Sequence, residues 1–389
     1  MLPLPEVRVS RKGAARVASG HPWIYSSDIL SRGSAQAGDT VRVTDPSGTL
    51  LGAALYSSTS QITLRIISQR VESLDRALLM ERIQSAAAYR KQAVKQSDAY
   101  RLVYGEADRL PGLVVDRYGD FMAVQALNQA MDRATGLVVS CLREMFAPQA
   151  IVARNDVAVR TRESLAVESK VLAGTLPRQV LVKLNDFTLA VDLLAGQKTG
   201  VFLDQRENYV AAARWARGKA LDCFTCTGGF ALHMAGNCDS VEAVDSSATA
   251  LKTAQANAAR NGLGNVTFLE ANVFDLLAGH DSAGRRFDTI VLDPPSFAKS
   301  RSNLDAALRG YKEINRRAFR LLEHGGILLS CSCSHHVSEA ALLEVIAEAS
   351  LDVHRQVRVL ERRTQALDHP VLLTVPETHY LKCLILQAL

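Results

Sequence analysis

Apolar and polar residues alternate along two short stretches near the amino terminus, residues 40–44 and 61–67. Alternation of this kind places one face of a strand in a core and the other toward solvent. Turn-forming residues at 36–39 and 45–48 bound the first stretch. We therefore expect residues 1–70 to form a small β-barrel.

The pattern changes to a helical one at residue 71, where apolar positions recur at intervals of three and four as far as about residue 101. A hairpin is expected next, with strands at 113–116 and 121–125 joined by a turn that contains Gly119. The remaining elements expected here are a helix near residues 131–146 and strands near 151–153 and 157–161. Together these elements predict a middle α/β domain over residues 71–180.

From residue 181 onward, short apolar strands alternate with helices. Strands are expected at residues 220–224, 241–245, 266–270, 289–293, 326–331 and 381–387. Helices are expected at residues 246–261, 303–322 and 338–350. This alternation indicates a doubly wound parallel sheet, in which ligands bind outside the carboxyl ends of the strands. The residues that follow each strand are therefore the candidates for chemistry.

The composition places the chain among ordinary globular proteins. Of its 389 residues, 48% are hydrophobic and 22% are charged, which excludes a disordered chain, a collagen-like fibre and a disulfide-stapled miniprotein. No apolar run is long enough to span a bilayer, and the first residues lack the apolar core of a secretory signal. The close pairs Cys223/Cys226 and Cys331/Cys333 do not resemble a secreted disulfide framework. We expect a soluble, reduced, cytoplasmic protein with no membrane partner.

The net charge of +5 is unevenly distributed. Residues 299–323 carry seven basic side chains against three acidic ones, and residues 1–70 carry eight against four. A run of charge usually forms a solvated helix face. Two separate basic regions also suit a polyanionic partner, because phosphate contacts supply much of the affinity for nucleic acid.

Polar or small residues follow the first predicted strand of the carboxyl-terminal part. Asp222 lies at its end, and Gly228 and Gly229 open the next helix, where backbone can approach a ligand closely. The sequence lacks the G-x-G-x-x-G fingerprint of dinucleotide binding. This absence disfavours a pyrophosphate-containing cofactor, and with it a nicotinamide-dependent dehydrogenase.

Three further strand ends carry polar groups of suitable chemistry. Asp245 ends the second strand, where a carboxylate can accept the hydroxyls of a ribose. Asn272 and Val273 follow the third strand, where a side-chain amide can meet the edge of an adenine. Asp293 ends the fourth strand on a turn stiffened by two prolines. The set predicts a ligand that contains adenosine.

These strand-end residues together resemble the motifs of class I S-adenosylmethionine-dependent methyltransferases. Residues 197–206, Q-K-T-G-V-F-L-D-Q-R, resemble the K-T-G-x-x-L-D-Q-R signature of one family of rRNA methyltransferases. Residues 105–118 resemble the middle domain of that family, and residues 21–25 are similar to part of a PUA domain, an RNA-binding module. The resemblance covers essentially the whole chain. It points to enzymes that make 5-methylcytosine in large-subunit rRNA.

The resemblance implies a PUA-like β-barrel at residues 1–70, a middle α/β domain at 71–180 and a Rossmann-like methyltransferase domain at 181–389. Its sheet is expected to be mostly parallel with an antiparallel last strand. The implied cofactor is S-adenosylmethionine, and the implied partner is 23S rRNA, either naked or in an assembling subunit; a homodimer is also compatible. The cofactor-binding residues that it implies are Gln197, Lys198, Phe202, Arg206, Asp222, Gly228, Gly229, Asp245, Asn272, Val273 and Asp293.

The family's fifth strand ends in Ser-Cys-Ser, which falls here on residues 332–334. The resemblance therefore implies that the thiolate of Cys333 adds to C6 of cytosine, which makes C5 nucleophilic toward the methyl group. Asp293 is expected to hold the N3/N4 edge of the base. Cys331 stays an alternative nucleophile, because side chains two residues apart share a strand face. The basic segment 299–320 is a candidate for lowering the pKa of the thiol, and the base that removes the C5 proton is not assigned.

Other interpretations remain open at this stage. The enzyme could methylate a base nitrogen, such as one of guanine, with Cys333 structural, or the chain could be a non-catalytic rRNA-binding assembly factor. The two cysteine pairs superficially offer four thiolates for zinc, but their spacing along a strand suits a tetrahedral site poorly. His335 and His336 are more typical of a solvated loop than of a base, and Trp23 and Tyr25 are more typical of a barrel core than of base stacking.

Overall fold

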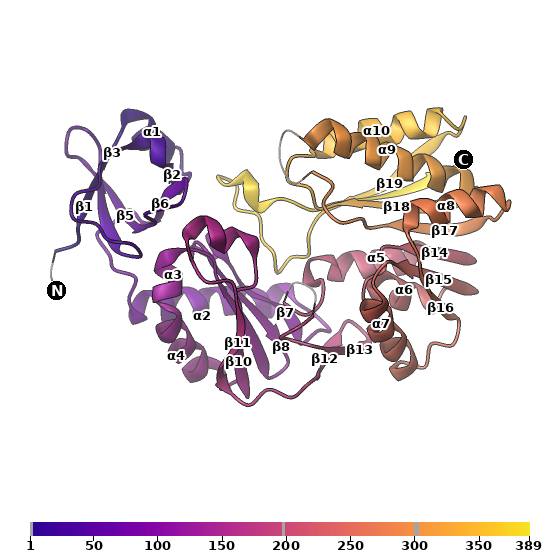
Figure 1. The fold of residues 1–389 in the computed structure, drawn as a ribbon, viewed down its shortest axis with the longest axis horizontal. Coiled ribbons are helices and arrows are strands. Elements are labelled where there is room, and N and C mark those ends of the chain that lie inside the picture. The colour runs from indigo at the N-terminus through magenta and orange to yellow at the C-terminus, as the bar shows by residue number, and fades with distance from the viewer. Residues whose placement is uncertain (1–2, 197–198, 299–302) are drawn as a thin grey trace. The chain divides into compact units, whose positions relative to one another are not determined.

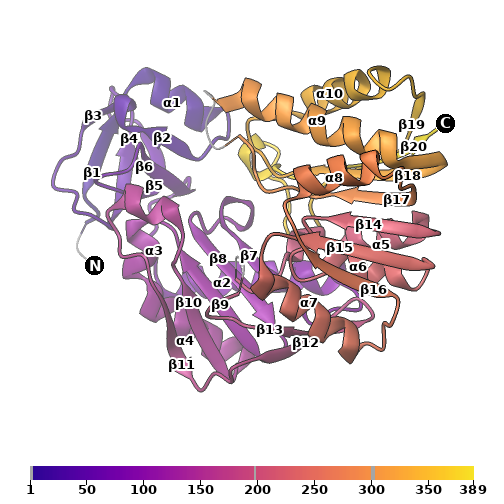
Figure 2. The ribbon, with the colours of Figure 1, turned by 45° about the vertical axis from the view of Figure 1, so that its right-hand side comes forward.

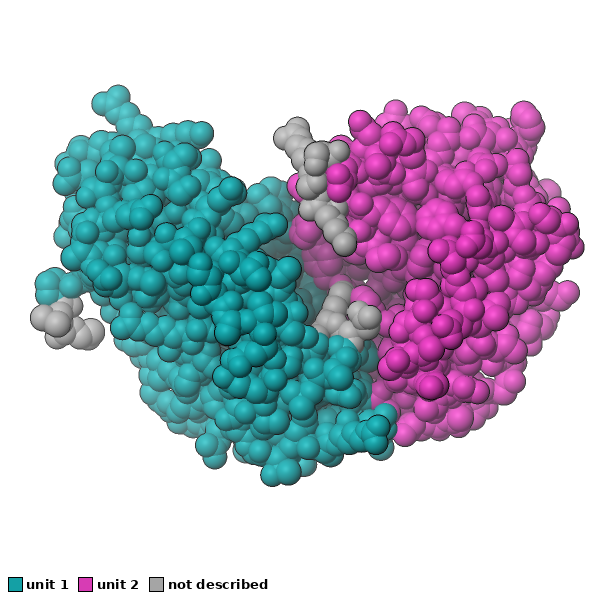
Figure 3. Space-filling model, in the orientation of Figure 1, with its two compact units in different colours: residues 1–182, 191–201, 367–378 teal, residues 183–190, 202–366, 379–389 magenta. Residues whose placement is uncertain are grey.

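The computed structural model describes residues 3–196, 199–298 and 303–389, and its chain separates into two units (Figures 1 and 3). The first unit, teal in Figure 3, comprises Met1–Val182, Val191–Val201 and Leu367–Thr378. The second unit, magenta, comprises Lys183–Ala190, Phe202–Ala366 and His379–Leu389. Two later segments of the chain therefore belong to the first unit. The domain boundaries near residues 70 and 180 stay predictions.

The amino-terminal part of the first unit contains a six-stranded sheet in the order β2-β6-β5-β4-β1-β3. Its elements are β1 (Glu6–Val9), α1 (Arg11–Ala18), β2 (Trp23–Tyr25), β3 (Ile29–Ser31), β4 (Thr40–Thr44), β5 (Leu50–Tyr56) and β6 (Ile62–Ser68). Alternation predicted β4 and β6 but missed β5. The reason is that β5 is buried on both faces: Ala54 and Tyr56 belong to one hydrophobic cluster, and Ala53 and Leu55 to another. A strand with two buried faces shows no alternation.

The rest of the first unit is built on a five-stranded sheet in the order β11-β10-β9-β8-β7. Its elements are α2 (Arg76–Ala93), β7 (Ala99–Tyr104), β8 (Leu113–Tyr118), β9 (Phe121–Ala126), α3 (Gln129–Arg133), α4 (Thr135–Phe146), β10 (Ala150–Arg154) and β11 (Ser169–Gly174). The predicted hairpin is confirmed, since Tyr118 pairs with Phe121 across a turn in which Gly119 has a φ of 59°. Ala53 and Leu55 of β5 share a core with Leu79 and Ile83 of α2. This shared core joins the two sheets into one unit.

Two expectations for this region were wrong in detail. The helix expected at residues 71–101 ends at Ala93, and a strand begins at Ala99. The strand expected at 157–161 is a 3-10 helix, Ala158–Glu163. In that helix Arg160 is buried and donates to the carbonyl oxygens of Ala166, at 2.7 Å, and Ala126. The buried guanidinium of Arg160 satisfies backbone carbonyl oxygens and so stabilises a turn here. The local sequence pattern that suggested a strand carries no information about this contact.

The second unit contains a seven-stranded sheet in the order β16-β15-β14-β17-β18-β20-β19. Its strands are β14 (Lys219–Cys223), β15 (Ser240–Asp245), β16 (Val266–Glu270), β17 (Phe287–Leu292), β18 (Leu322–Ser332), β19 (Val357–Arg363) and β20 (Lys382–Ala388). The strands from β16 to β18 are parallel, and β20 pairs antiparallel with β18. The doubly wound class, mostly parallel with an antiparallel last strand, is therefore confirmed. Strand β19 at the sheet edge was not predicted.

Helices cover both faces of this sheet (Figures 1 and 2). They are α5 (Arg206–Trp215), α6 (Gly229–Ala235), α7 (Ala248–Arg260), α8 (Val273–Ser282), α9 (Leu304–Leu321) and α10 (Glu339–Leu351). The last three lie on one face, and α5, α6 and α7 on the other. Lys183–Ala190 of this unit lie in a two-stranded sheet formed by β12 (Val180–Leu184) and β13 (Phe187–Val191). No helix among the described residues is long and apolar enough to cross a membrane.

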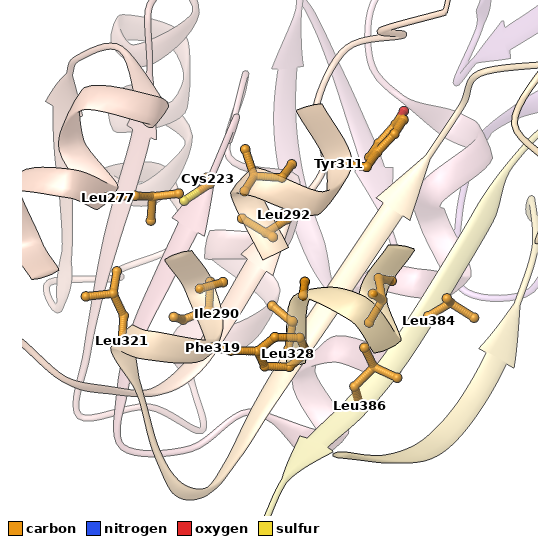
Figure 4. Close-up of a cluster of buried hydrophobic side chains, with 14 of the residues drawn as sticks. Cys223, Leu277, Ile290, Leu292, Tyr311, Phe319, Leu321, Leu328, Leu384 and Leu386 are labelled. Atoms are coloured by element: carbon orange, nitrogen blue, oxygen red, sulfur yellow. The ribbon is translucent and has the colours of Figure 1, made fainter. Parts of the chain in front are cut away.

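The core between the sheet and α9 fixes where the carboxyl ends of the strands lie. Phe319 of α9 packs with Leu328 of β18 and Ile290 of β17, and all three are fully buried (Figure 4). Tyr311 belongs to the same cluster, two turns nearer the start of α9. Packing along α9 therefore places the Tyr311 hydroxyl beside the end of β18.

Candidate active site

The loop after β14 has a strained backbone. Phe224 has a φ of 64° and Cys226 a φ of 49°, so two residues that carry side chains adopt the left-handed conformation within three positions. Gly228 follows with a φ of 89°, and Gly229 begins α6. A Cβ atom on Gly229 would lie 2.4 Å from the ring of Tyr209, so packing alone requires this glycine. Backbone strain of this kind persists only where the surrounding structure enforces it, and it is found most often at functional sites.

Asp222, at the end of β14, is fully buried and only half satisfied. Its Oδ2 atom accepts hydrogen bonds from Thr225 Oγ1 at 2.5 Å and from the Ala231 backbone nitrogen at 2.9 Å. Its Oδ1 atom is buried and has no hydrogen-bond partner among the residues that the structure describes. Burial raises the pKa of Asp222 to about 7, and the nearby carboxylates of Asp293 and Asp245 act in the same direction. A ligand that donates a proton or carries positive charge would satisfy this carboxyl group.

Asp245 and Asn272 both hold the loops that follow their strands. Asp245 accepts one backbone hydrogen bond at each oxygen, from Cys226 and from Ser247, both at 2.9 Å. A carboxylate has about four acceptor positions, so capacity for ribose hydroxyls remains. The Asn272 side-chain oxygen caps α8 by accepting from the Phe274 nitrogen at 2.9 Å, which leaves its amide NH₂ group as the part able to meet an adenine. The Val273 side chain is buried in the hydrophobic core, so only its backbone can reach a ligand.

The end of β17 lies beside the end of β14. The backbone nitrogen of Asp293 donates to the carbonyl oxygen of Cys223 at 3.4 Å, and Pro294 behind it is buried. Strands β14, β15 and β17 are parallel neighbours, so the three carboxyl groups at or after their ends share one edge of the sheet. Asp293 and Asp245 accordingly both raise the pKa of Asp222. The structure thus brings together the strand-end residues that the sequence singled out.

The structure describes two of the four cofactor-binding residues that were predicted in the segment leading into α5. Gln197 and Lys198 lie outside the described residues. Phe202 is half-buried ahead of α5, and its carbonyl oxygen accepts from the Tyr209 hydroxyl at 3.4 Å. Arg206 is buried at the start of α5, where its guanidinium lies 3.1 Å from Glu207. Burial and this ion pair give Arg206 a clear role within the fold, and a contact to cofactor stays a prediction.

The two cysteines near the end of β18 differ sharply. Cys331 is fully buried on the strand, opposite Cys383 of β20. Its hydrogen bond with Cys383 and its burial raise the pKa of Cys331 well above that of an ordinary thiol. Cys333 comes directly after the strand and is partly exposed. Reactivity requires access and a thiolate, so the geometry favours Cys333 over Cys331.

Hydroxyl groups fix the backbone on both sides of Cys333. The Ser332 hydroxyl donates to the Tyr311 hydroxyl at 2.9 Å, and Tyr311 also contacts Ser334 Oγ at 3.1 Å. Ser334 Oγ in turn lies 3.0 Å from Ser296 Oγ, in the turn after Asp293. No pattern in the sequence indicates a role for Tyr311, which comes from a helix about twenty positions earlier. This network ties the end of β18 to the turn after β17.

Lys382, the first residue of β20, is a second residue that the sequence analysis did not single out. It pairs with Ser332 in the β18–β20 ladder and is only 4% exposed. Its ammonium donates to the carbonyl oxygen of Ser334 at 2.7 Å and to that of Tyr380 at 2.9 Å. Burial lowers the pKa of Lys382 to about 8, and the charge of an ionised Cys333 acts in the opposite direction. The signal was the one charged residue in the predicted strand at residues 381–387.

The basic segment is largely neutralised by neighbouring carboxylates. Lys312 contacts Glu348 at 3.1 Å and Asp352 at 3.2 Å, and Arg320 contacts Asp281 at 3.1 Å. Arg316 and Arg317 both pair with Glu313. Arg309 is exposed, and residues 299–302 lie outside the described part of the chain. The segment is therefore less strongly cationic than its sequence suggests.

Potential metal ligands and the histidines after Cys333 were the other groups that the sequence raised for this region. Within the described ranges, no group of three or more histidine, cysteine, aspartate or glutamate side chains could hold a metal ion. No disulfide joins the seven cysteines, all of which are described. His335 and His336 are exposed, as expected for a loop. The site is thus made of carboxyl groups, hydroxyls, a thiol and a lysine.

An S-adenosyl cofactor fits the sheet edge on chemical grounds. The orphaned Oδ1 atom of Asp222 is suited to the ammonium of an amino acid moiety, because it is buried beside two further carboxyl groups. Asp245 retains acceptor positions for a ribose, and the Asn272 amide can donate to an adenine. These two acceptors and one donor therefore match the three parts of the cofactor.

Comparisons with known proteins agree with this chemistry. Residues 7–69 match a PUA-like domain, and residues 148–374 match an S-adenosylmethionine-dependent methyltransferase family. The chain is 43% identical to ribosomal RNA large subunit methyltransferase I of Shewanella denitrificans, over 94% of both chains. It is 39% identical to the protein of the same name from Klebsiella pneumoniae strain 342, over 93% of both chains.

Solved structures show the same fold. A candidate S-adenosylmethionine-dependent methyltransferase from Streptococcus mutans has a TM-score of 0.84 at 21% identity and covers 99% of this chain and 100% of its own. A methyltransferase structure complexed with S-adenosylhomocysteine gives a TM-score of 0.85 with the same identity and coverage. The predicted PUA-like domain, methyltransferase domain and cofactor class are confirmed by these matches.

Proposed function

The chain belongs to the ribosomal RNA large subunit methyltransferase I family of S-adenosylmethionine-dependent enzymes, and from this premise we propose that it methylates C5 of a cytosine in 23S rRNA. The observation that carries the proposal is the position of Cys333. Its partly exposed thiol comes directly after β18, in the same row of strand ends as Asp222, Asp245 and Asp293. Methylation of a base nitrogen needs no thiol at this place.

The chemistry explains why a thiol is needed. C5 of cytosine is too electron-poor to attack a methyl group, so the Cys333 thiolate first forms a bond to C6 and the electron pair moves to C5. S-adenosylmethionine, when bound, supplies an electrophilic methyl group. A base then takes the C5 proton, the bond between sulfur and C6 breaks, and the thiolate is restored.

Asp293 is proposed to hold the base during this cycle. It follows β17 on a turn whose Ser296 is linked through Ser334 to the segment that carries Cys333. A carboxyl group there can accept from the exocyclic N4 amino group through one oxygen and, when protonated, donate to N3 through the other, which stabilises the negative charge that shifts toward N3 during addition. The turn and the thiol are held by the same hydroxyl network, so their spacing is set before substrate arrives.

The PUA-like domain and exposed basic residues are proposed to bind the rRNA. Arg309 is exposed on α9, whereas Lys312, Arg316 and Arg317 are paired with carboxylates. Phosphate contacts from the paired side chains would require breaking those ion pairs. We therefore assign α9 a smaller share of RNA affinity than its sequence implies.

The decisive experiment uses rRNA that carries 5-fluorocytosine, incubated with S-adenosylmethionine. Fluorine cannot leave as a proton, so a covalent protein–RNA adduct should accumulate with the wild-type protein and with Cys331→Ala, but not with Cys333→Ala. Loss of the adduct only in Cys331→Ala would move the nucleophile. Methyl transfer to ordinary rRNA without any adduct would favour a base nitrogen, and RNA binding without methyl transfer would favour a non-catalytic role.

A further inference from the structure

We propose that the ammonium group of Lys382 holds Cys333 in its thiolate form, which makes Lys382 a positioning residue for the nucleophile. The inference rests on the proposed function only in taking Cys333 as the reactive group. Strand β20 runs antiparallel to β18, with Lys382 opposite Ser332 and Cys383 opposite Cys331. This register brings the lysine to the point where β18 ends and Cys333 begins the loop.

The hydrogen bonds of Lys382 fix its ammonium beside this loop. It donates to the carbonyl oxygen of Ser334, the residue after Cys333, at 2.7 Å, and to that of Tyr380 at 2.9 Å. An ammonium has three protons to donate, so these two bonds leave one. No carboxylate among the described residues lies within ion-pair distance of Lys382 Nζ. The side chain is 4% exposed, so water replaces few of the missing partners.

A buried cation of this kind is costly unless an anion lies near it. Cys333 and Lys382 interact electrostatically, and the interaction raises the pKa of the lysine when the thiol is ionised. Such coupling is reciprocal: the ammonium favours the thiolate as much as the thiolate favours the ammonium. Lys382 thus supplies the positive charge near the Cys333 thiol. The sequence had suggested the basic segment 299–320 as the source of that charge.

Other charged and titratable groups also influence the protonation of Lys382 and Cys333. Glu339, at the start of α10, favours the protonated lysine, while Asp293 after β17 lies near Cys331 and Tyr311 as a further negative charge. Tyr311 of α9 also interacts with Cys333. A carboxylate near the thiol opposes formation of a second anion. A fixed cation at Lys382 offsets that repulsion.

The test measures the alkylation rate of Cys333 by iodoacetamide as a function of pH, with peptide mass spectrometry to separate it from Cys331. Four forms are compared: wild type, Lys382→Gln, Lys382→Arg and Lys312→Met. Glutamine keeps NH₂ donors for the two carbonyl oxygens but has no charge, and arginine keeps the charge. Lys312→Met removes a half-buried cation of α9 that is paired with carboxylates, and it serves as the matched control.

We expect the thiol of the wild type to titrate below the ordinary value of about 8.5. Lys382→Gln should raise its midpoint by about one unit, which slows alkylation about tenfold at pH 7. Lys382→Arg should remain close to wild type, and Lys312→Met should be unchanged. A folded Lys382→Gln protein, judged by its thermal transition and its S-adenosylhomocysteine binding, with an unshifted midpoint would overturn the inference. If Lys382→Gln does not fold, an unchanged midpoint in Lys382→Arg supports the proposal and an upward shift there contradicts it.

The outcome is separable from that of the proposed function. A shifted midpoint without any 5-fluorocytosine adduct would support the role of Lys382 and reject cytosine-C5 chemistry. An adduct with an unshifted midpoint would support the chemistry and reject this role. Accumulation of an adduct with ordinary cytosine in Lys382→Gln, again with an unshifted midpoint, would assign Lys382 to proton removal and overturn the inference.

Discussion

The hydroxyl of Thr225 donates a 2.5 Å hydrogen bond to Oδ2 of Asp222, while the second oxygen of the same carboxyl group is buried and finds no partner within the described part of the chain. Thr225 lies in the strained loop between β14 and α6, so the bond links the carboxyl group to the backbone conformation of that loop. The raised pKa of Asp222, about 7, follows from this half-satisfied burial. It makes the cofactor-free protein sensitive to pH.

The direction of this pH dependence follows from the linkage between proton binding by Asp222 and folding. A carboxyl group whose folded pKa exceeds its unfolded value binds more protons in the folded state between the two values. The free energy of unfolding should therefore fall as the pH rises from about 4 to about 7, by at most about 1.4 kcal/mol per pH unit from this group. Urea unfolding of the cofactor-free protein at several pH values measures the slope. Asp222→Asn should remove this part of the slope; an equal slope in both proteins would contradict the assignment.

Tyr311→Phe tests the hydroxyl network around Cys333. The change removes the acceptor of Ser332 and a partner of Ser334, so the unfolding free energy should fall by about 1–2 kcal/mol. We expect kcat to fall several-fold with little change in KM for RNA, because the backbone on both sides of Cys333 loses an anchor. Steady-state methyl transfer measures both constants. Tyr89→Phe is the matched control, since it removes a hydroxyl that donates to the Leu367 carbonyl oxygen at 2.9 Å. Equal kinetic losses in the two variants would argue against a positioning role.

Glu163→Ala tests the ion pair that joins the PUA-like sheet to the 3-10 helix after β10. Arg65 and Glu163 are 2.9 Å apart and both are buried, so removing the carboxylate leaves an unpaired guanidinium. The unfolding free energy should fall by about 3–5 kcal/mol, as measured by urea denaturation. Glu168→Ala breaks an exposed pair with Lys170 and should cost less than about 1 kcal/mol. A small loss in Glu163→Ala would mean that this contact contributes little to the first unit.

The sequence located the strand ends of the second unit well because the signals there are local. Asp222, Asp245 and Asp293 each follow a run of apolar residues, and all strands of a parallel sheet present their carboxyl ends to the same edge. Prediction of secondary structure failed where a segment is not buried on one face and exposed on the other. Strand β5 has two buried faces, and residues 158–163 form a turn around the buried Arg160, so neither shows the pattern of its true structure.

The sequence by itself determined the class of fold, the edge of the sheet that carries the chemistry and, through its motifs, the family. Periodicity and strand-end residues report only on neighbours along the chain, and these properties depend on such neighbours. Tertiary structure decided which charges act at Cys333. The register of β20 against β18 brings Lys382 to the end of β18, where its ammonium donates to the carbonyl oxygen of the residue after Cys333. Packing of α9 brings Tyr311 to the same strand end, while most of the basic segment pairs with carboxylates. Contacts between distant segments depend on register and packing, which no local pattern encodes.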